Sequence, residues 1–337
     1  MLSGGDPAGI GPDIALSAWT HRLEHDVPAF AIYADAAVLA DRASRLGLDV
    51  PIARSSDLAN AVGAFPRALP VIDVPCTRPV IAGQPDSVNG GAVIAAIELA
   101  TAAVASGKAA ALVTNPIAKH VLYDAGFTHP GHTEFLAELA ERHFPGRSYH
   151  SVMMLAAEEL RVVPLTIHVA LAAVPGMITP ALIEETARIL DAALRTDYGI
   201  ATPRIAVAGL NPHAGENGTM GTEDRDVIAP AVARLRRAGL EIGGPYSGDT
   251  LFHAEARASY DAVIAMYHDQ ALIPLKTLAF DRGVNITLGL PFVRTSPDHG
   301  TAFDIAGTGR ASAASLIAAL KEARRMATSR RSAALNA

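Results

Sequence analysis

The stretch 262-AVIAMYHDQALIPLK-276 carries the pattern on which the fold prediction rests. It opens with an apolar run, and Tyr267, His268, Asp269 and Gln270 then follow as a polar, partly titratable group. A short run that is apolar throughout is typical of a strand buried on both faces of a parallel sheet. The carboxyl ends of such strands are the usual ligand-binding positions of α/β proteins. The stretch therefore predicts a buried strand that ends at a functional site.

The same alternation of runs continues in both directions along the chain. Other strand-like runs are 29-AFAIYA-34, 110-AALVT-114, 161-RVVPLTIHV-169 and 204-RIAVAGL-210. Helix-like runs are 90-GGAVIAAIELATAAVASG-107, 179-TPALIEETARILDAALRTDYG-199 and 226-DVIAPAVARLRRAGL-240. Because strands that alternate with helices usually pair in parallel, the chain is predicted to have an α/β fold with a largely parallel sheet.

The length of the chain indicates two domains. A sequence of 337 residues exceeds a typical single core, and its composition, half apolar and 18% charged, is that of a globular protein. Turn-forming residues are concentrated between residues 115 and 130, and the C-terminal helix-like run can pack back on the first domain. We therefore expect a discontinuous first domain, residues 1–125 and 300–337, and a second domain, residues 126–299.

Composition also argues against several classes of protein. The net charge of -6 and the lack of a basic stripe argue against a nucleic-acid partner. Polar residues, Gly and Pro interrupt the apolar runs before they reach 18 residues, so no membrane span is expected. The N-terminus does not have the pattern of a signal peptide. Cys76 is the only cysteine, which excludes an internal disulfide and fits a reducing cytoplasm.

Three histidines lie at or just beyond the ends of strand-like runs. His168 ends VVPLTIH, His213 follows IAVAGLNP, and His268 follows AVIAMY. If the strands are neighbours in a parallel sheet, their carboxyl ends open into one crevice, where three imidazoles could bind a divalent ion. The alternative is that each histidine is simply hydrogen-bonded at the edge of the sheet. The long intervals between the three do not form a metal-binding motif.

A group of potential anion-binding residues follows the third histidine. Lys276, one of four lysines, is followed by Asn285 and Arg294 within a largely apolar segment. A lysine, an amide and an arginine can together bind a phosphate or a carboxylate. The alternative is a solvated surface, but buried polar groups in an apolar segment need partners.

Three loops are also candidates for binding. In 131-GHTEFLAELAERHF-144, His132 and Thr133 precede an amphipathic helix whose amino end favours an anion, although Thr133 could serve only as a helix cap. The glycine-rich turns 4-GGDPAGIGPDI-14 and 211-NPHAGENGTMGTED-224 lack the Rossmann fingerprint. The loop 296-SPDHGTAFDIAGTGR-310 can lie against an adenosine or can be a tight structural loop.

Together these motifs resemble the 4-hydroxythreonine-4-phosphate dehydrogenase family of vitamin B6 biosynthesis. The matching segments are GDPAGIGP, GHTEFLAE, MMLAAEELRVVPLTIH, GLNPHAGENGTMGTED, AMYHDQALIPLK and GVNITLGLPFVRTSPDHGTAFDIAG. They extend from residue 4 to about residue 310 and so cover nearly the whole chain. One departure is that only four residues precede Gly5, where the family normally has a complete strand.

The resemblance implies a two-domain fold similar to isocitrate and isopropylmalate dehydrogenases, with the active-site cleft between the domains. It implies NAD or NADP as cofactor, bound without a Rossmann fingerprint. It also implies a homodimer whose interface lies on the second domain and whose metal sites, each with one Zn, Co, Mg or Mn ion, are completed by the partner subunit. The expected location is the cytoplasm.

The resemblance also assigns residues. The metal ligands would be His168, His213 and His268. The substrate contacts would be His132, Thr133, Lys276, Asn285 and Arg294. The cofactor contacts would be His299, Gly300, Thr301 and Ala302. Asp249 and Asp269 are candidates for the general base or for residues that support the metal ligands.

The implied reaction oxidises 4-phosphooxy-L-threonine at C3 and then decarboxylates the product to 3-amino-2-oxopropyl phosphate, on the route to pyridoxal 5'-phosphate. Other substrates within the family are cis-dihydrodiol carboxylates and threonate phosphates. An alternative of another class is a hydrolase in which three histidines hold a metal-activated water. A metabolite-binding protein without catalysis is a further alternative.

Overall fold

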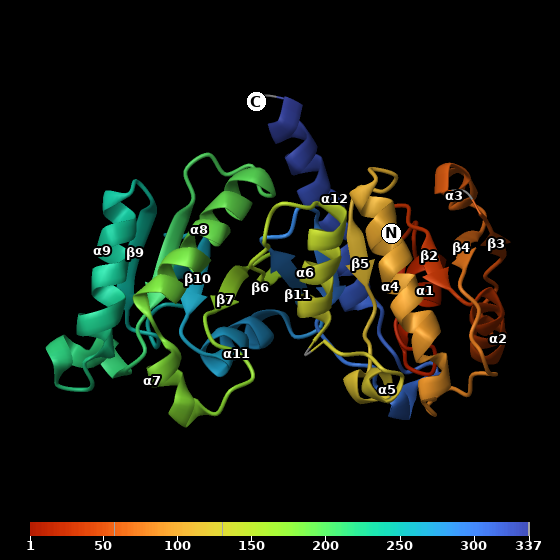
Figure 1. The fold of residues 1–337 in the computed structure, drawn as a ribbon, viewed down its shortest axis with the longest axis horizontal. Helices are drawn as coiled ribbons and strands as arrows, with labels where there is room; N and C mark the ends of the chain where they lie inside the picture. Colours follow the sequence, from red (N-terminus) through yellow and green to blue (C-terminus); the bar gives the residue numbers. More distant parts are fainter. Residues whose placement is uncertain (57, 130, 336–337) are drawn as a thin grey trace. The chain divides into compact units, whose positions relative to one another are not determined.

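The protein consists of two compact units in a computed structural model that describes residues 1–335 except 57 and 130 (Figure 1). Unit 1 comprises Met1–Ser151 and Leu290–Ala327, and unit 2 comprises Val152–Gly289 and Thr328–Ala337. The sequence placed the divisions at 125/126 and 299/300, whereas the units divide at 151/152 and 289/290. Residues 132–143 belong to unit 1 because they form a helix that packs into its core.

Unit 1 is an entirely parallel sheet covered by helices. Its strands lie in the order β3-β4-β2-β1-β5-β12, and every neighbouring pair is parallel. The strands are β1 (Leu2–Ser3), β2 (Ile32–Ala34), β3 (Ile52–Arg54), β4 (Leu69–Asp73), β5 (Leu112–Thr114) and β12 (Arg294–Pro297). The helices are α1 (Gly11–Thr20), α2 (Ala36–Leu46), α3 (Leu58–Ala64), α4 (Gly90–Ala105), α5 (Lys119–Asp124), α6 (His132–His143) and α12 (Ala314–Leu335), whose last turns belong to unit 2.

The first strand of unit 1 is short but central. β1 contains only Leu2 and Ser3, and it pairs with β2 on one side and with β5 on the other. Both residues are fully buried. The strand therefore forms here although only four residues precede Gly5, the departure noted in the sequence.

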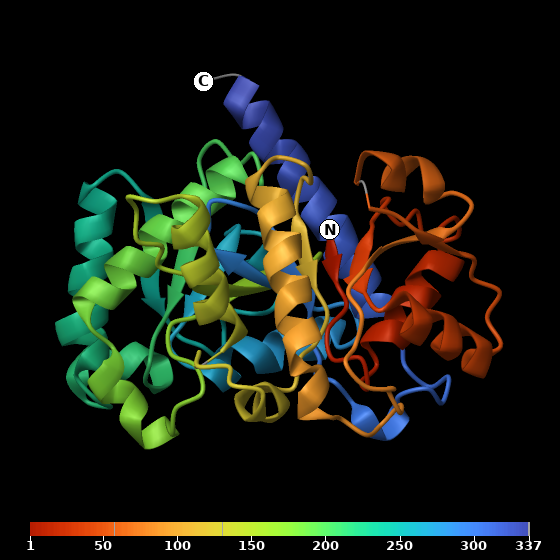
Figure 2. The same cartoon turned by 45° about the vertical axis from the view of Figure 1, so that its right-hand side comes forward.

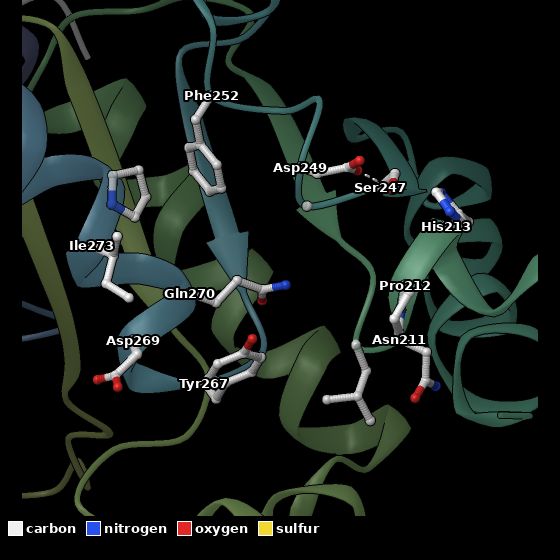
Figure 3. A pocket seen from close by; sticks show the side chains of 13 residues that line it. Asn211, Pro212, His213, Ser247, Asp249, Phe252, Tyr267, Asp269, Gln270 and Ile273 are labelled. Carbon is white, nitrogen blue, oxygen red and sulfur yellow. Dashed lines mark hydrogen bonds between the residues drawn. The ribbon is translucent and has the colours of Figure 1, made fainter. Parts of the chain in front are cut away.

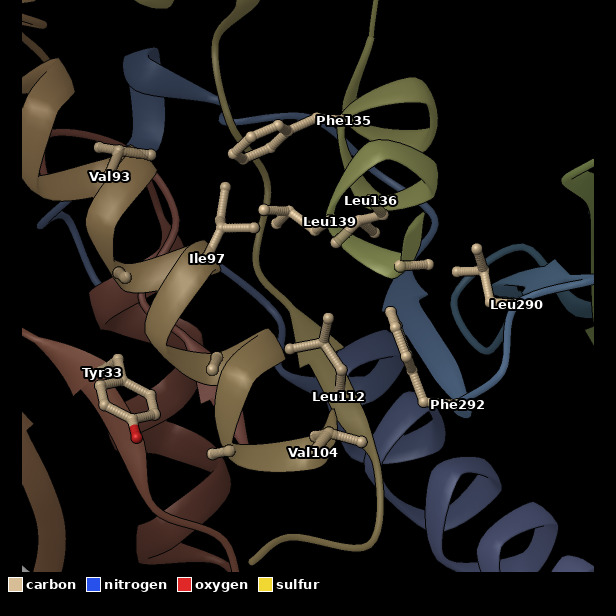
Figure 4. Close-up of a cluster of buried hydrophobic side chains, with 14 of the residues drawn as sticks. Tyr33, Val93, Ile97, Val104, Leu112, Phe135, Leu136, Leu139, Leu290 and Phe292 are labelled. Carbon is tan, nitrogen blue, oxygen red and sulfur yellow. The ribbon is translucent and has the colours of Figure 1, made fainter. Parts of the chain in front are cut away.

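Helix α4 forms the centre of the unit 1 core. It packs on β1, β2 and β5 and runs beside α6 (Figure 1, Figure 2). Ile97 and Val104 of α4 meet Leu136 and Leu139 of α6 and Phe292 in one apolar cluster (Figure 4). By length and composition alone, the segment Ser87–Ala105 is apolar enough to cross a membrane. Half of that window is buried, as in the core helix of a folded domain.

Unit 2 is a mixed sheet with a parallel part. Its strands lie in the order β11-β6-β7-β10-β8-β9. The pairs of β6 with β11 and β7 are antiparallel, whereas β7, β10, β8 and β9 pair in parallel. The strands are β6 (Val152–Ala157), β7 (Leu160–Pro164), β8 (Arg204–Ala208), β9 (Glu241–Tyr246), β10 (Ala262–Ala265) and β11 (Val284–Leu288). The helices are α7 (Val174–Met177), α8 (Pro180–Thr196), α9 (Ala229–Arg237), α10 (Ala254–Arg257) and α11 (His268–Ala279).

Two helices of unit 2, α8 and α9, correspond to predicted helix-like runs. α8 begins after Thr179, whose hydroxyl accepts a hydrogen bond from the Leu182 amide at 3.2 Å and caps the helix. α9 is preceded by a π-helical turn, Asp224–Ile228, so the predicted run 226–240 yields a shorter α-helix. The α/β class and the largely parallel strand pairing predicted from the sequence are confirmed.

Candidate functional site

The three predicted metal ligands follow three adjacent parallel strands of unit 2. β10 pairs with β7 on one side and with β8 on the other, so the three strands end at the same edge of the sheet. His168 follows β7, His213 follows β8, and His268 is the first residue of α11 after β10. The arrangement required for convergence of the three strand ends is therefore present.

Two of the three imidazoles lie close together. The ring centroids of His168 and His268 are 5.7 Å apart, and the rings are tilted by 43°. Two imidazoles that bind one ion through bonds of about 2 Å bring their centroids to about 5–6 Å. The Nδ1 atom of His268 lies 2.7 Å from a carboxylate oxygen of Asp269, which leaves Nε2 as the nitrogen for a ligand. This pair fits a divalent ion in both spacing and chemistry.

His213 lies on the wall of a cavity of about 650 Å³ in unit 2 (Figure 3). The cavity is lined by Leu210, Asn211, Pro212, His213, Ser247, Gly248, Asp249, Phe252, Tyr267, Asp269, Gln270, Ile273 and Pro274. Figure 3 shows the side chains of His213, Asp249 and Ser247 on one side and those of Asp269, Gln270 and Tyr267 on the other. Apart from residues 57, 130, 336 and 337, the chain has no cluster of three or more His, Cys, Asp or Glu side chains that could hold a metal ion.

Asp249 and Asp269, the two candidate bases, both line this cavity. The Asp249 carboxylate accepts a hydrogen bond from the Ser247 hydroxyl at 2.5 Å. That bond and the nearby His213 hold the pKa of Asp249 below its ordinary value, so the group is ionised at neutral pH. Asp269 is exposed and contacts His268. Asp249 is thus a proton acceptor of low basicity, whereas the carboxylate of Asp269 contacts the His268 ring.

Gln270, which the sequence patterns did not identify as a functional residue, holds two strand ends together. Its side-chain oxygen accepts a hydrogen bond from the Met266 amide at 2.7 Å, and its nitrogen donates to the Gly209 carbonyl at 2.8 Å. The Thr166 hydroxyl likewise donates to the Met266 carbonyl at 2.8 Å. The ends of β7, β8 and β10 are therefore connected by side chains, and contacts of this kind between distant segments leave no signal in local sequence patterns.

In unit 1, Arg294 is the centre of a second polar cluster. Only 4% of Arg294 is exposed, and its Nη2 donates to the Thr114 hydroxyl at 2.7 Å. Burial lowers the pKa of Arg294 to about 10, which still leaves it charged at neutral pH. A buried cation at the first position of β12 requires an anionic or strongly polar neighbour.

His132 belongs to the same cluster. Burial, together with the charges of Arg294 and Lys119, holds the pKa of His132 well below its ordinary value, so its ring is neutral. Its Nε2 atom is buried and has no hydrogen-bond partner within the described part of the chain. Lys119 at the start of α5 was not singled out from the sequence. The cluster therefore combines two cations with a neutral imidazole, which suits an anionic ligand.

The other predicted substrate contacts lie in regular elements. α6 begins at His132 after Gly131, which is the N-cap without a side-chain bond, so Thr133 lies in the first turn and is not the cap. Lys276 lies in α11, with its Nζ 5.5 Å from the centroid of the Phe280 ring. Asn285 lies in β11 opposite Leu155 of β6. The contact roles of all three stay predictions.

The predicted cofactor loop follows β12 and packs on the first glycine-rich turn within unit 1. The Thr301 carbonyl accepts a hydrogen bond from the Ile10 amide at 2.9 Å, and a Cβ on Gly9 would lie 2.9 Å from the same oxygen. Ala302 has a φ of 41°, in the left-handed region. His299 has a buried Nε2 without a hydrogen-bond partner in the described residues, and its Nδ1 lies 3.1 Å from the Gly300 carbonyl oxygen.

Comparison with known proteins identifies the family. The profile of the family "Pyridoxal phosphate biosynthetic protein PdxA" matches residues 26–323. The 4-hydroxythreonine-4-phosphate dehydrogenase of Methylorubrum populi is 60% identical over 329 residues, which are 97% of this chain and 93% of the relative. The chain belongs to the PdxA family of 4-hydroxythreonine-4-phosphate dehydrogenases. The resemblance inferred from the motifs is thereby confirmed.

Solved structures support the same family. The chain aligns with the 4-hydroxythreonine-4-phosphate dehydrogenase of Klebsiella pneumoniae with a TM-score of 0.86 and 38% identity, covering 97% of this chain and 98% of that one. The terephthalate 1,2-cis-dihydrodiol dehydrogenase of Burkholderia xenovorans is less similar, with a TM-score of 0.62, 28% identity and coverage of 96% of each chain. The dehydrogenases of 4-hydroxythreonine 4-phosphate are thus closer to this chain than the dihydrodiol enzyme in both sequence and structure.

Proposed function

We propose that this PdxA-family oxidoreductase oxidises 4-phosphooxy-L-threonine at C3 with NAD or NADP and then decarboxylates the keto acid to 3-amino-2-oxopropyl phosphate. The observation that carries the proposal is the placement of His168, His213 and His268 after three adjacent parallel strands in a chain 60% identical to a 4-hydroxythreonine-4-phosphate dehydrogenase. The product would serve pyridoxal 5'-phosphate biosynthesis in the cytoplasm.

We assign the metal to His168, His213 and His268, with one divalent ion in each site. The spacing of the first and third rings and the carboxylate on His268 support this assignment. When bound, such an ion would lower the pKa of the substrate hydroxyl and polarise the ketone. From the family resemblance we also propose a homodimer in which the partner subunit completes each metal site. The described residues of one chain place the rings of His168 and His268 together and hold no cluster of three such ligands, which supports this proposal.

The protein's own side chains then perform three tasks. Asp269 orients the His268 ring through its Nδ1 contact and keeps the other nitrogen in its acceptor form. Asp249, ionised and on the wall of the cavity, accepts the proton of the C3 hydroxyl directly or through a water. Arg294 and His132, with Thr133, Lys276 and Asn285, bind the anionic groups of the substrate.

The nicotinamide cofactor is assigned to the loop that follows β12. His299, Gly300, Thr301 and Ala302 would contact its adenosine, since this segment is an ordered loop whose backbone is fixed by the first glycine-rich turn. The sequence holds no Rossmann fingerprint, and the family resemblance implies that this loop recognises the cofactor instead.

A turnover assay with a panel of substrates tests the proposal. The purified protein is given 4-phosphooxy-L-threonine, a cis-dihydrodiol carboxylate or a threonate phosphate, each with NAD or NADP and with Zn, Co, Mg or Mn. We expect reduced nicotinamide, followed by its absorbance, to form fastest with 4-phosphooxy-L-threonine and only with a divalent ion. Preference for another substrate would contradict the assigned reaction, and substrate hydrolysis without nicotinamide would favour the metal-dependent hydrolase.

A further inference from the structure

The segment that carries His213 has a backbone conformation that L-amino acids rarely adopt. Residues 213–217, here called the left-handed turn, have φ values of 52°, 50°, 75°, 42° and 57°. Only the third of the five is a glycine; the others are His213, Ala214, Glu216 and Asn217. Successive left-handed residues are unfavourable because each Cβ approaches its own carbonyl. Such a turn persists only where its surroundings determine it.

Asp224 supplies much of that surrounding structure. This carboxylate is 1% exposed and accepts hydrogen bonds from the Leu210 amide at 2.8 Å, the Asn211 amide at 3.1 Å and the Asn211 side chain at 2.9 Å. The Asn211 carbonyl in turn accepts from the Ala214 amide at 3.1 Å. Asp224 thus fixes the two residues that lead into the left-handed turn.

Two glycines make room for this carboxylate. A Cβ on Gly209 would lie 2.8 Å from Asp224 Oδ1 and 2.9 Å from the Cα of Ala214. A Cβ on Gly215 would lie 3.2 Å from Asp224 Oδ2. The carboxylate is therefore held between the end of β8 and the turn, with little space for any other side chain.

We propose that Asp224 is a positioning residue that holds the left-handed turn and thereby fixes the His213 imidazole at the cavity wall. Asp224 does not line the cavity, so it acts through the turn and not by contact with a ligand. The consequence for metal binding rests on the proposed role of His213 as a ligand, whereas the consequence for the position of the ring does not. The carboxylate that supports His268 is adjacent in sequence, but the one that supports His213 lies eleven residues away.

The test replaces Asp224 by Asn, which keeps the shape of the side chain. Leu210 donates to one carboxylate oxygen and Asn211 to the other, so an amide group must face a donor at one of the two positions. Asp197→Asn is the matched control, because Asp197 is a fully buried carboxylate of the same unit that binds Arg330 and the Thr196 hydroxyl. The full-length variants are compared below their unfolding temperatures.

The first measurement requires no metal. Imidazole NMR signals of His213, assigned with His213→Ala, should shift or broaden in Asp224→Asn and stay unchanged in Asp197→Asn. If Asp224→Asn does not fold, Gly209→Ala replaces it, since its methyl group would push against the same carboxylate and against Ala214. Unchanged His213 signals in the folded variant would overturn the proposal.

The second measurement is calorimetric titration with Zn²⁺. We expect Asp224→Asn to weaken binding at least about tenfold and Asp197→Asn to leave it within about twofold. Wild-type affinity in Asp224→Asn together with lost affinity in His213→Ala would overturn the positioning role and leave the proposed metal site intact. Wild-type affinity in His213→Ala would instead contradict the metal site, and the NMR comparison would then decide the positioning role by itself.

Discussion

The Arg294 cluster of unit 1 and the cavity of unit 2 that His213 lines are both polar sites, but the first is buried and the second is open to solvent. In unit 1, burial shifts the pKa of both His132 and Arg294 downward, and the cation stays charged in the interior. In unit 2, His168 and Asp269 are exposed, and Asp269 and His213 line a cavity of about 650 Å³. A buried cation selects a ligand of fixed negative charge, whereas open imidazoles can exchange protons, ions and reacting groups.

The two regions suit two different tasks of the proposed enzyme. The phosphate of a substrate keeps its charge throughout the proposed reaction, so its binding residues can be rigid and desolvated. The hydroxyl that is oxidised changes its charge and bonding, so its neighbours need solvent and mobile protons. Substitutions in the two regions should consequently change different kinetic parameters.

The largest effect is expected at His268. Replacement by Ala removes one of the two imidazoles that lie together, and we expect metal content and turnover to fall, turnover by at least about a thousandfold. Metal analysis and initial rates measure both quantities, while circular dichroism should show a retained fold. His143→Ala, at an exposed histidine of α6, is the control. Full metal content with normal turnover would remove His268 from the site.

The second effect is expected at Arg294, where the parameter that changes should be KM. Loss of a buried cation that binds an anionic group should raise the KM for 4-phosphooxy-L-threonine at least about thirtyfold, with a smaller change in kcat. Steady-state kinetics of Arg294→Ala are compared with those of Arg54→Ala, an exposed arginine paired with Asp73 at 3.2 Å. An unchanged KM would show that the buried cluster does not bind the substrate. It would also contradict the division between anion binding in unit 1 and chemistry in unit 2.

A third prediction concerns the support of His268 by Asp269. Asp269→Asn keeps the size of the side chain but removes the carboxylate charge beside the His268 imidazole. We therefore expect the metal affinity of the site to fall about tenfold. Calorimetric titration with Zn²⁺ measures it, with the exposed Asp281→Asn as control. Equal affinities for both variants would mean that the 2.7 Å contact has no role in orienting the ring.

The smallest effect is expected in the pH dependence of stability. Because the pKa of His132 in the folded protein is well below that in the unfolded chain, the unfolded state binds the proton more readily. The contribution of the neutral His132 ring to the free energy of unfolding is therefore fully present above the unfolded pKa of about 6.5. It decreases as the pH falls below that value, by up to about 1.4 kcal/mol per pH unit. Thermal unfolding between pH 7.5 and 5 should show a shallower slope for His132→Asn than for the wild type. Equal slopes would indicate a ring that is not desolvated.

Much of the fold was predictable because its signals are local. The apolar runs around residues 112, 205 and 263 are strands, and the run at 90–107 is helix α4. The order β7-β10-β8 was not predictable, since neighbours in a sheet depend on contacts between segments far apart in the sequence, such as Val162 with Val263 and Ile205 with Ala262. Nor did any pattern predict that α11 begins at His268, because Pro274 interrupts its helical period.

The candidate site was predictable in its residue types but not in its supporting contacts. His168 and His268 were recognised from their positions after strands, and their rings do lie together. Thr114, by contrast, contacts Arg294 across 180 residues, and Lys119 influences His132 only through the folded chain. The left-handed turn at His213 follows a glycine-rich motif, but its conformation depends on the buried Asp224. Metal, cofactor and dimer assignments stay predictions.

In the proposed function, one enzyme couples oxidation of a phosphorylated hydroxy amino acid to loss of CO2. The most direct measurement follows reduced nicotinamide by absorbance and released CO2 in the same reaction with 4-phosphooxy-L-threonine and a divalent ion. We expect equal molar amounts of reduced nicotinamide and CO2 from the wild type, and neither product from His268→Ala. Reduced nicotinamide without CO2, or turnover that needs no nicotinamide, would contradict it.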